Sequence, residues 1–109
     1  MRQLSIPACL VALALQTAPA LAADEADAMT LLKDSRCTKC HDVAKQKAGP
    51  PFAKIAAKYQ GDADAKAKLT RHVTVASEVE IDGEKEPHGI VKTRDAARIE
   101  NLIGWILTR

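Results

Sequence analysis

The stretch Cys37-Thr38-Lys39-Cys40-His41 places two thiols three residues apart and follows the second with an imidazole. A thioredoxin-type redox pair would follow a strand in a β-α-β pattern, whereas a helical pattern precedes Cys37. A zinc site would need two further ligands at a short spacing, but His72 and His88 are sixteen residues apart. A simple disulfide between the two cysteines would leave His41 unexplained.

The C-x-x-C-H spacing is the one used for covalent attachment of haem c. A tight turn holds the two sulfurs at the separation of the two porphyrin vinyl groups, and the next residue directs its imidazole to the iron. We therefore expect one haem c, tethered through Cys37 and Cys40, with His41 as its proximal ligand. Aromatic residues make up only 3 % of the chain, and a bound porphyrin would add the apolar bulk that a small core needs.

The first 22 residues are typical of a secretory signal peptide. Arg2 precedes a mainly apolar run from Ile6 to Leu15, and Ala20-Leu21-Ala22 provides a small-residue cleavage pattern. The apolar run is shorter than the about 20 residues of a membrane-spanning helix, although an uncleaved anchor is the alternative. We expect a signal peptide over residues 1–22 and one domain over residues 23–109. This domain would lie in the periplasm, where haem c is attached, without stable membrane insertion after cleavage.

The remaining 87 residues suit a single domain of the all-α class. Apolar residues recur at helical spacing from Asp24 up to Cys37, from Phe52 to Tyr59, from Asp62 or Asp64 to Ala76, and from Thr93 to Ile106. Residues 77–92 are expected to form a loop. Val79 and Ile81 could form a short strand there, but the acids around them argue against a buried one. Gly104 predicts that another helix crosses closely at that point.

Opposite charges are segregated along the chain. Residues 33–71 carry ten Lys or Arg against four acids, whereas residues 78–86 carry five acids against Lys85 alone. We expect a basic side and an acidic side, with simple solvation of both faces as the alternative. The net charge of +2 for the whole chain gives no indication of a nucleic-acid partner.

From the CTKCH motif onward the chain resembles the short bacterial class I cytochromes c. The likeness rests on that motif, on an amphipathic helix before it, on Gly49-Pro50 eight residues after His41, on Phe52-x-x-Ile55-Ala56-x-Lys58-Tyr59, and on Trp105 in the last helix. The resemblance implies a cytochrome c fold, with three to four short helices and long loops around one covalently bound haem. It also implies that the Pro50 carbonyl accepts a hydrogen bond from His41 Nδ1, and that Gly104 and Trp105 pack the last helix across the first.

The sequence departs from this family at the second axial ligand. The usual methionine before the last helix is missing, because the chain has no Met after Met29. His88 lies in that loop, within Glu86-Pro87-His88-Gly89, and we expect His41 and His88 to ligate the iron together. The alternatives are a solvated His88 away from the iron, or His72 as the distal ligand.

Three other residues are weaker candidates for the distal position. Met29 lies in the first helix, where it is expected to pack in the core. Lys85 and Lys92 would each have to lose a proton before an amine could bind iron.

Two imidazole ligands predict a reduction potential well below that of relatives with histidine and methionine, and the acidic loop acts in the same direction. We expect a one-electron carrier, not an enzyme, that serves periplasmic redox proteins. Exposed lysines would steer an acidic partner to the haem edge: Lys39, Lys45, Lys47 and Lys54. A gas-binding haem sensor with a displaceable distal ligand is the alternative. A small peroxidase ranks last, since its only distal acid-base groups would be His72 and His88.

Overall fold

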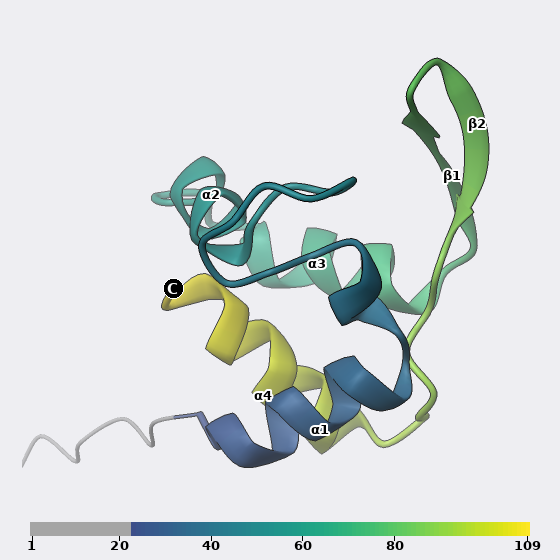
Figure 1. Cartoon of the computed structure of the whole chain (residues 1–109). Coiled ribbons are helices and arrows are strands. Elements are labelled where there is room, and N and C mark those ends of the chain that lie inside the picture. Colours follow the sequence, from purple (N-terminus) through teal and green to yellow (C-terminus); the bar gives the residue numbers. More distant parts are fainter. Residues whose placement is uncertain (1–22) are drawn as a thin grey trace, which may run out of the picture.

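The computed structural model describes residues 23–109, so the predicted signal peptide lies outside the described residues. The described chain forms α1 (Glu25–Asp34), the short 3-10 turn η1 (Cys37–Lys39), α2 (Phe52–Lys58), α3 (Ala65–Thr74), β1 (Ser77–Ile81), β2 (Glu84–His88) and α4 (Ala96–Leu107). Figure 1 shows the helices gathered into one body from which the two strands project. The predicted helical fold is confirmed. Within residues 23–109, no helix is long and apolar enough to cross a membrane.

Helix α4 is the centre of the core, because α1, α2 and α3 all pack against it. The apolar stripe predicted for this helix is buried: Ile99, Leu102, Ile103, Trp105 and Ile106. It meets buried side chains from the three other helices: Ala28, Leu31 and Leu32 of α1, Phe52 of α2, and Leu69 of α3. Full burial of one large apolar side chain contributes about 1.5–3 kcal/mol, so these contacts hold the helices in place.

The helix ends differ from the prediction at two points. The last helix starts at Ala96 and not near Thr93, because the Asp95 side chain caps it by accepting hydrogen bonds from the backbone N–H groups of Ala97 and Arg98. The first helix is capped at Asp24, whose side chain accepts a hydrogen bond from the Asp27 N–H. It ends at Asp34, however, and does not run directly into Cys37, because Arg36 adopts a left-handed conformation with φ 60°.

The crossing of α1 and α4 is held by polar contacts at its start. The Arg98 guanidinium lies 3.0 Å from the Asp27 carboxylate, and the Asn101 side chain pairs with both backbone groups of Asp24. Helices α1 and α4 pack against each other as predicted, but their approach at Gly104 is not tight: among residues 23–109, a Cβ at this position would come near only Ala23, at an ordinary contact distance of 4.0 Å. Glycine is therefore not required there.

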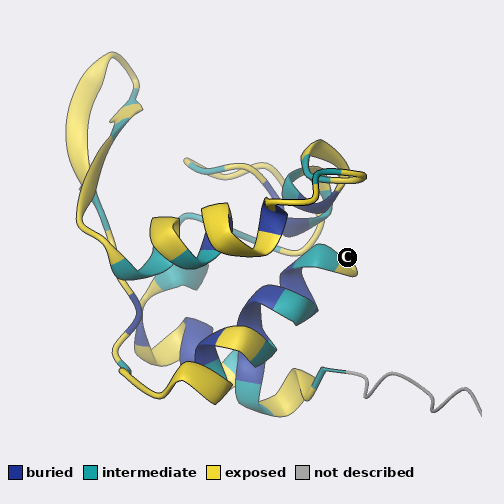
Figure 2. Ribbon diagram, turned by 180° about the vertical axis from the view of Figure 1, so that it is seen from behind, coloured by how far each residue is buried: buried dark blue, intermediate teal, exposed yellow. Residues whose placement is uncertain are grey.

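The region 77–92, predicted as a loop, contains a β-hairpin. Strands β1 and β2 pair antiparallel from Ser77 opposite His88 to Ile81 opposite Glu84. Asp82 and Gly83 connect them with φ of 52° and 81°, the conformation that an Asp-Gly hairpin turn requires. Figure 2 shows the hairpin exposed along most of its length. The expectation that no buried strand forms here is confirmed, but the paired strands were missed.

Candidate haem-binding site

The CTKCH motif forms one tight turn directly after α1. The left-handed backbone at Arg36 reverses the chain into η1, and the Cys37 carbonyl then accepts hydrogen bonds from the N–H groups of Cys40 and His41, at 3.2 and 3.0 Å. Both cysteines are half-buried, and no disulfide joins them. Burial raises the pKa of the Cys37 thiol. The turn thus presents two sulfurs and one imidazole within a single short segment.

The chain after His41 folds back onto the motif. The Gly49 N–H donates to the Cys40 carbonyl at 2.8 Å, and the Phe52 N–H donates to the Asp42 carbonyl at 2.9 Å. These backbone bonds bring Gly49-Pro50 beside His41 and set the direction in which α2 begins. Backbone hydrogen bonds therefore bring Gly49 next to His41, although the two are eight residues apart in the sequence.

Asp42 stabilises the first turn of this returning loop. Its carboxylate accepts hydrogen bonds from the backbone N–H groups of Lys45 and Ala44, at 2.9 and 3.2 Å. These two bonds lower the pKa of Asp42 below its ordinary value. Asp42 thus stabilises the turn that directly follows His41.

The His41 ring is confined on three sides. Its Nδ1 donates a hydrogen bond to the Pro50 carbonyl at 2.6 Å, the contact that the family resemblance implies. Gly49 lies so close that a Cβ there would be 2.7 Å from His41 Cε1. The Phe52 ring stacks on the imidazole with 5.4 Å between centroids, and Trp105 packs behind Phe52 at 5.5 Å. Because Nδ1 is engaged, Nε2 is the nitrogen left free to bind a metal.

His88, the predicted distal ligand, faces this ring from the end of β2. The ring centroids of His41 and His88 are 6.2 Å apart, with an angle of 63° between the planes. Two imidazoles on opposite sides of one metal, each with a metal–nitrogen distance of about 2 Å, have their centroids about 6 Å apart. The separation therefore fits one iron between the two rings.

Two further properties of His88 suit a metal ligand. Its Nδ1 is buried without a hydrogen-bond partner among the described residues, and such an orphaned polar atom is costly in a protein interior. Desolvation lowers the pKa of His88, and the neighbouring His72 and His41 lower it further. The neutral imidazole favoured in this way is the form that binds metals.

His72 joins the other two histidines of the chain at this site. It lies in the last turn of α3, exposed, with its ring centroid 4.0 Å from that of His88 and 40° between the planes. Desolvation lowers its pKa, as do the charges of His41 and Lys58. The structure thus brings together imidazoles from the motif, from α3 and from β2.

The other candidates for the distal position have different surroundings. Met29 packs against the hydrophobic core, as predicted. Lys85 lies opposite Glu80 in the exposed hairpin. Lys92 is exposed as well, and its backbone N–H donates to the Ser35 hydroxyl.

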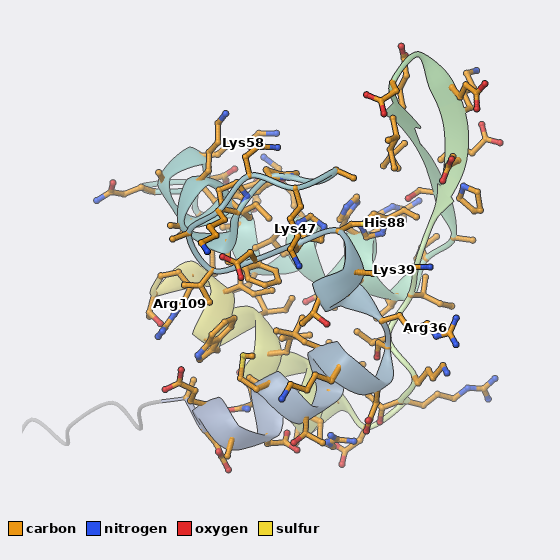
Figure 3. All side chains as sticks on the ribbon, in the orientation of Figure 1. Arg36, Lys39, Lys47, Lys58, His88 and Arg109 are labelled. Atoms are coloured by element: carbon orange, nitrogen blue, oxygen red, sulfur yellow. The ribbon has the colours of Figure 1, made fainter. Side chains whose placement is uncertain are left out.

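Basic side chains gather on the body near the motif. The Lys47 ammonium donates a hydrogen bond to the Thr38 carbonyl at 2.8 Å, so it lies across the CTKCH turn. Figure 3 shows Lys47 and Lys39 on the same side of the molecule as His88, with the acidic hairpin projecting away from the body. Lys45 and Lys54 are exposed on the returning loop and on α2.

Sequence reasoning missed the part played by Gly49 and Phe52 in holding His41. The signal for it was present, because a glycine and two prolines directly precede Phe52. A residue without a side chain is needed where backbone and ring approach so closely.

The chain is similar to known proteins over most of its length. A family model described as cytochrome c matches residues 25–109. Among curated proteins, cytochrome c-551 of Allochromatium vinosum is 38 % identical over 96 residues, covering 86 % of this chain and 94 % of that protein. Cytochrome c-551 of Pseudomonas denitrificans is 32 % identical over 78 residues, covering 72 % and 92 %.

Solved structures give the same answer for the fold. The class 1 cytochrome MtoD from Sideroxydans lithotrophicus matches with a TM-score of 0.76 at 42 % identity, covering 80 % of this chain and 97 % of that one. Cytochrome c552 of Nitrosomonas europaea matches with a TM-score of 0.58 at 30 % identity, covering 73 % and 96 %. The chain belongs to the cytochrome c family: it is a class I c-type cytochrome, an electron carrier rather than an enzyme, with one haem c attached through Cys37 and Cys40.

Proposed function

We propose that this cytochrome is a periplasmic one-electron carrier of low potential, with His41 as proximal and His88 as distal iron ligand. The observation that carries the proposal is the separation of 6.2 Å between the two imidazole centroids. The absence of any methionine after Met29 supports it, because no thioether is available from the segment that precedes α4.

The haem, when bound, supplies the exchange of one electron between ferric and ferrous iron. The protein sets how readily this occurs. The Pro50 carbonyl holds the Nδ1 proton of His41, which makes the ring a stronger donor and fixes its orientation. Two imidazole donors favour the ferric state more than one imidazole and one thioether do. If His41 and His88 both ligate the iron, no coordination position would remain for a substrate.

The acidic hairpin acts in the same direction as the ligands. It ends at His88, and five of its residues are acids: Glu78, Glu80, Asp82, Glu84 and Glu86. Negative charge near the iron stabilises the oxidised and more positive state. Low potential thus follows from both ligand type and local charge.

The N-terminal segment and the exposed lysines indicate where the protein acts and which partners it meets. The expected signal peptide over residues 1–22 would deliver the chain to the periplasm, leaving the domain over residues 23–109 as the mature carrier. Its partners would be periplasmic redox proteins with an acidic docking face, which Lys39, Lys45, Lys47 and Lys54 would attract.

Spectra of the purified exported protein test the proposal. We expect the mass of residues 23–109 plus one haem, and a low-spin six-coordinate iron without a sulfur-to-iron charge-transfer band. Carbon monoxide should not bind readily, and the midpoint potential should lie below that of His/Met cytochromes c in the same buffer. A high-spin iron with rapid carbon monoxide binding would favour the gas-sensor alternative. A high potential would contradict the proposed ligand set.

A further inference from the structure

We propose that His72 is a reserve distal ligand, which takes the sixth coordination position of the iron when His88 leaves it. This inference rests on the proposed ligation by His41 and His88 and extends it to the third histidine. The geometric basis is the contact between His72 and His88, whose ring centroids are 4.0 Å apart. Figure 3 shows that His88 points into the body of the molecule, away from the projecting part of the hairpin.

His72 and His88 lie on elements that are packed on the body to very different degrees. His72 belongs to α3, which packs on α4 through the buried Leu69 and the partly buried Val73. His88 ends a two-stranded hairpin whose residues are mostly exposed. A hairpin of two strands alone is only marginally stable in water. His72 therefore keeps its place if the hairpin moves, whereas His88 does not.

The exchange requires that the hairpin can move relative to α3. The segments that join it to the body contain Val75 and Ile90, which are 44 % and 45 % exposed. Beyond them, the Val91 N–H donates to the Val73 carbonyl at 2.9 Å and ties the returning chain to the end of α3. A displacement of β1 and β2 can thus leave α3 and the segment after Val91 unchanged.

The exchange itself is chemically simple. The bond between the iron and His88 would break and a bond between the iron and His72 would form, with no electron gained or lost. One neutral imidazole replaces another, so no proton is taken up or released either. The iron would have two imidazole ligands in both states, and only the element that supplies the distal ring would change.

Three variants of the holoprotein test the proposal: His72→Ala, His88→Ala and the double variant. Each is studied by electron paramagnetic resonance, absorption spectra and the rate of carbon monoxide binding. We expect His72→Ala to stay low-spin with the spectrum of the wild type. We expect His88→Ala to stay low-spin and six-coordinate but with altered g values, since a ring from another element is bound. The double variant should become high-spin and bind carbon monoxide at least tenfold faster than His88→Ala.

The outcomes separate this proposal from the function on which it rests. A high-spin His88→Ala that binds carbon monoxide as fast as the double variant would overturn the role of His72 and leave the ligation by His88 intact. A low-spin double variant would overturn it too, because another ligand would then be present. A high-spin wild type would overturn the proposed function itself.

Two controls distinguish the loss of a distal ligand from misfolding of the variants. Added imidazole should restore the low-spin spectrum of the double variant, which shows that the distal side is still formed. His88→Val keeps a residue suited to a strand and should match His88→Ala in all three measurements. A high-spin His88→Val with native helix content would again overturn the reserve role.

Discussion

The backbone of Gly49 approaches the ring of His41 so closely that a Cβ at this position would lie 2.7 Å from Cε1 and 3.0 Å from Nδ1. The same approach brings the Pro50 carbonyl to 2.6 Å from Nδ1. The hydrogen bond between His41 and Pro50 therefore depends on a residue without a side chain at position 49.

We predict that Gly49→Ala destabilises the protein by about 1–3 kcal/mol, because the added methyl group must displace the ring or the loop. The strained ring should also lose part of its hydrogen bond to Pro50 and donate less to the iron, which raises the midpoint potential. Unfolding by guanidinium and a redox titration measure the two effects. Unchanged stability together with an unchanged potential would contradict the close contact.

Gly104→Ala is the matched control, with an expected effect of opposite sign. Within the described part of the chain, a Cβ there would come near only Ala23, at 4.0 Å, and alanine is favoured over glycine inside a helix by about 1 kcal/mol. We expect the free energy of unfolding to rise by about this amount. A decrease would indicate a closer crossing of α1 and α4 than the structure has.

Trp105→Ala should be among the most costly single changes in the core. Trp105 is 1 % exposed and packs against Phe52, which in turn stacks on His41. Truncation of a buried tryptophan typically costs about 3–5 kcal/mol. The loss is measured by denaturant unfolding of the holoprotein, and a cost below about 1 kcal/mol would show that the aromatic stack carries little of the stability.

Glu86→Gln should raise the midpoint potential more than Glu84→Gln. Both acids lie on β2, but Glu86 is two residues closer to His88, or about 7 Å along the strand. An exposed charge contributes about 1 kcal/mol or less, which corresponds to about 40 mV or less for one electron. Redox titrations at low and high salt check this, since screening should reduce both shifts. Equal shifts of the midpoint potential for the two variants would contradict a dependence on the distance between the acid and His88.

Asp42 predicts an acid-dependent loss of stability. Hydrogen bonds from the Lys45 and Ala44 N–H groups lower its pKa in the folded state. The unfolded state then binds the proton more readily, so the stabilising contribution is complete above the unfolded pKa of about 4 and is lost as the pH falls through the lower folded pKa. Carbon-detected NMR titration of the carboxyl checks the direction. Asp42→Ala should weaken the pH dependence of unfolding below about pH 4.

The hairpin was missed in the sequence although the residues of its turn indicate it. Ile81-Asp82-Gly83-Glu84 contains an Asp-Gly pair between alternating residues, a strong signal for a hairpin turn. The many acids around it instead suggested a loop, because a buried strand could not hold them. An exposed hairpin satisfies both facts, since its side chains remain in water on both faces.

The sequence by itself determined the haem attachment, the helical class and the lack of a methionine ligand before α4. Each of these depends on residues that are close along the chain: the spacing of Cys37, Cys40 and His41, the periodicity of apolar residues, and the composition of one segment. Covalent spacing and helical period are short-range properties, so no tertiary contact is needed to infer them.

Only the tertiary structure decided how the three histidines meet. His72 and His88 are sixteen residues apart in the sequence, and the hairpin between them returns the chain to the end of α3. His41 reaches the same place because α1, α2 and α3 all pack on the apolar stripe of α4. The contacts among the rings thus arise from the burial of core residues far from them in sequence, which no local pattern around a histidine encodes.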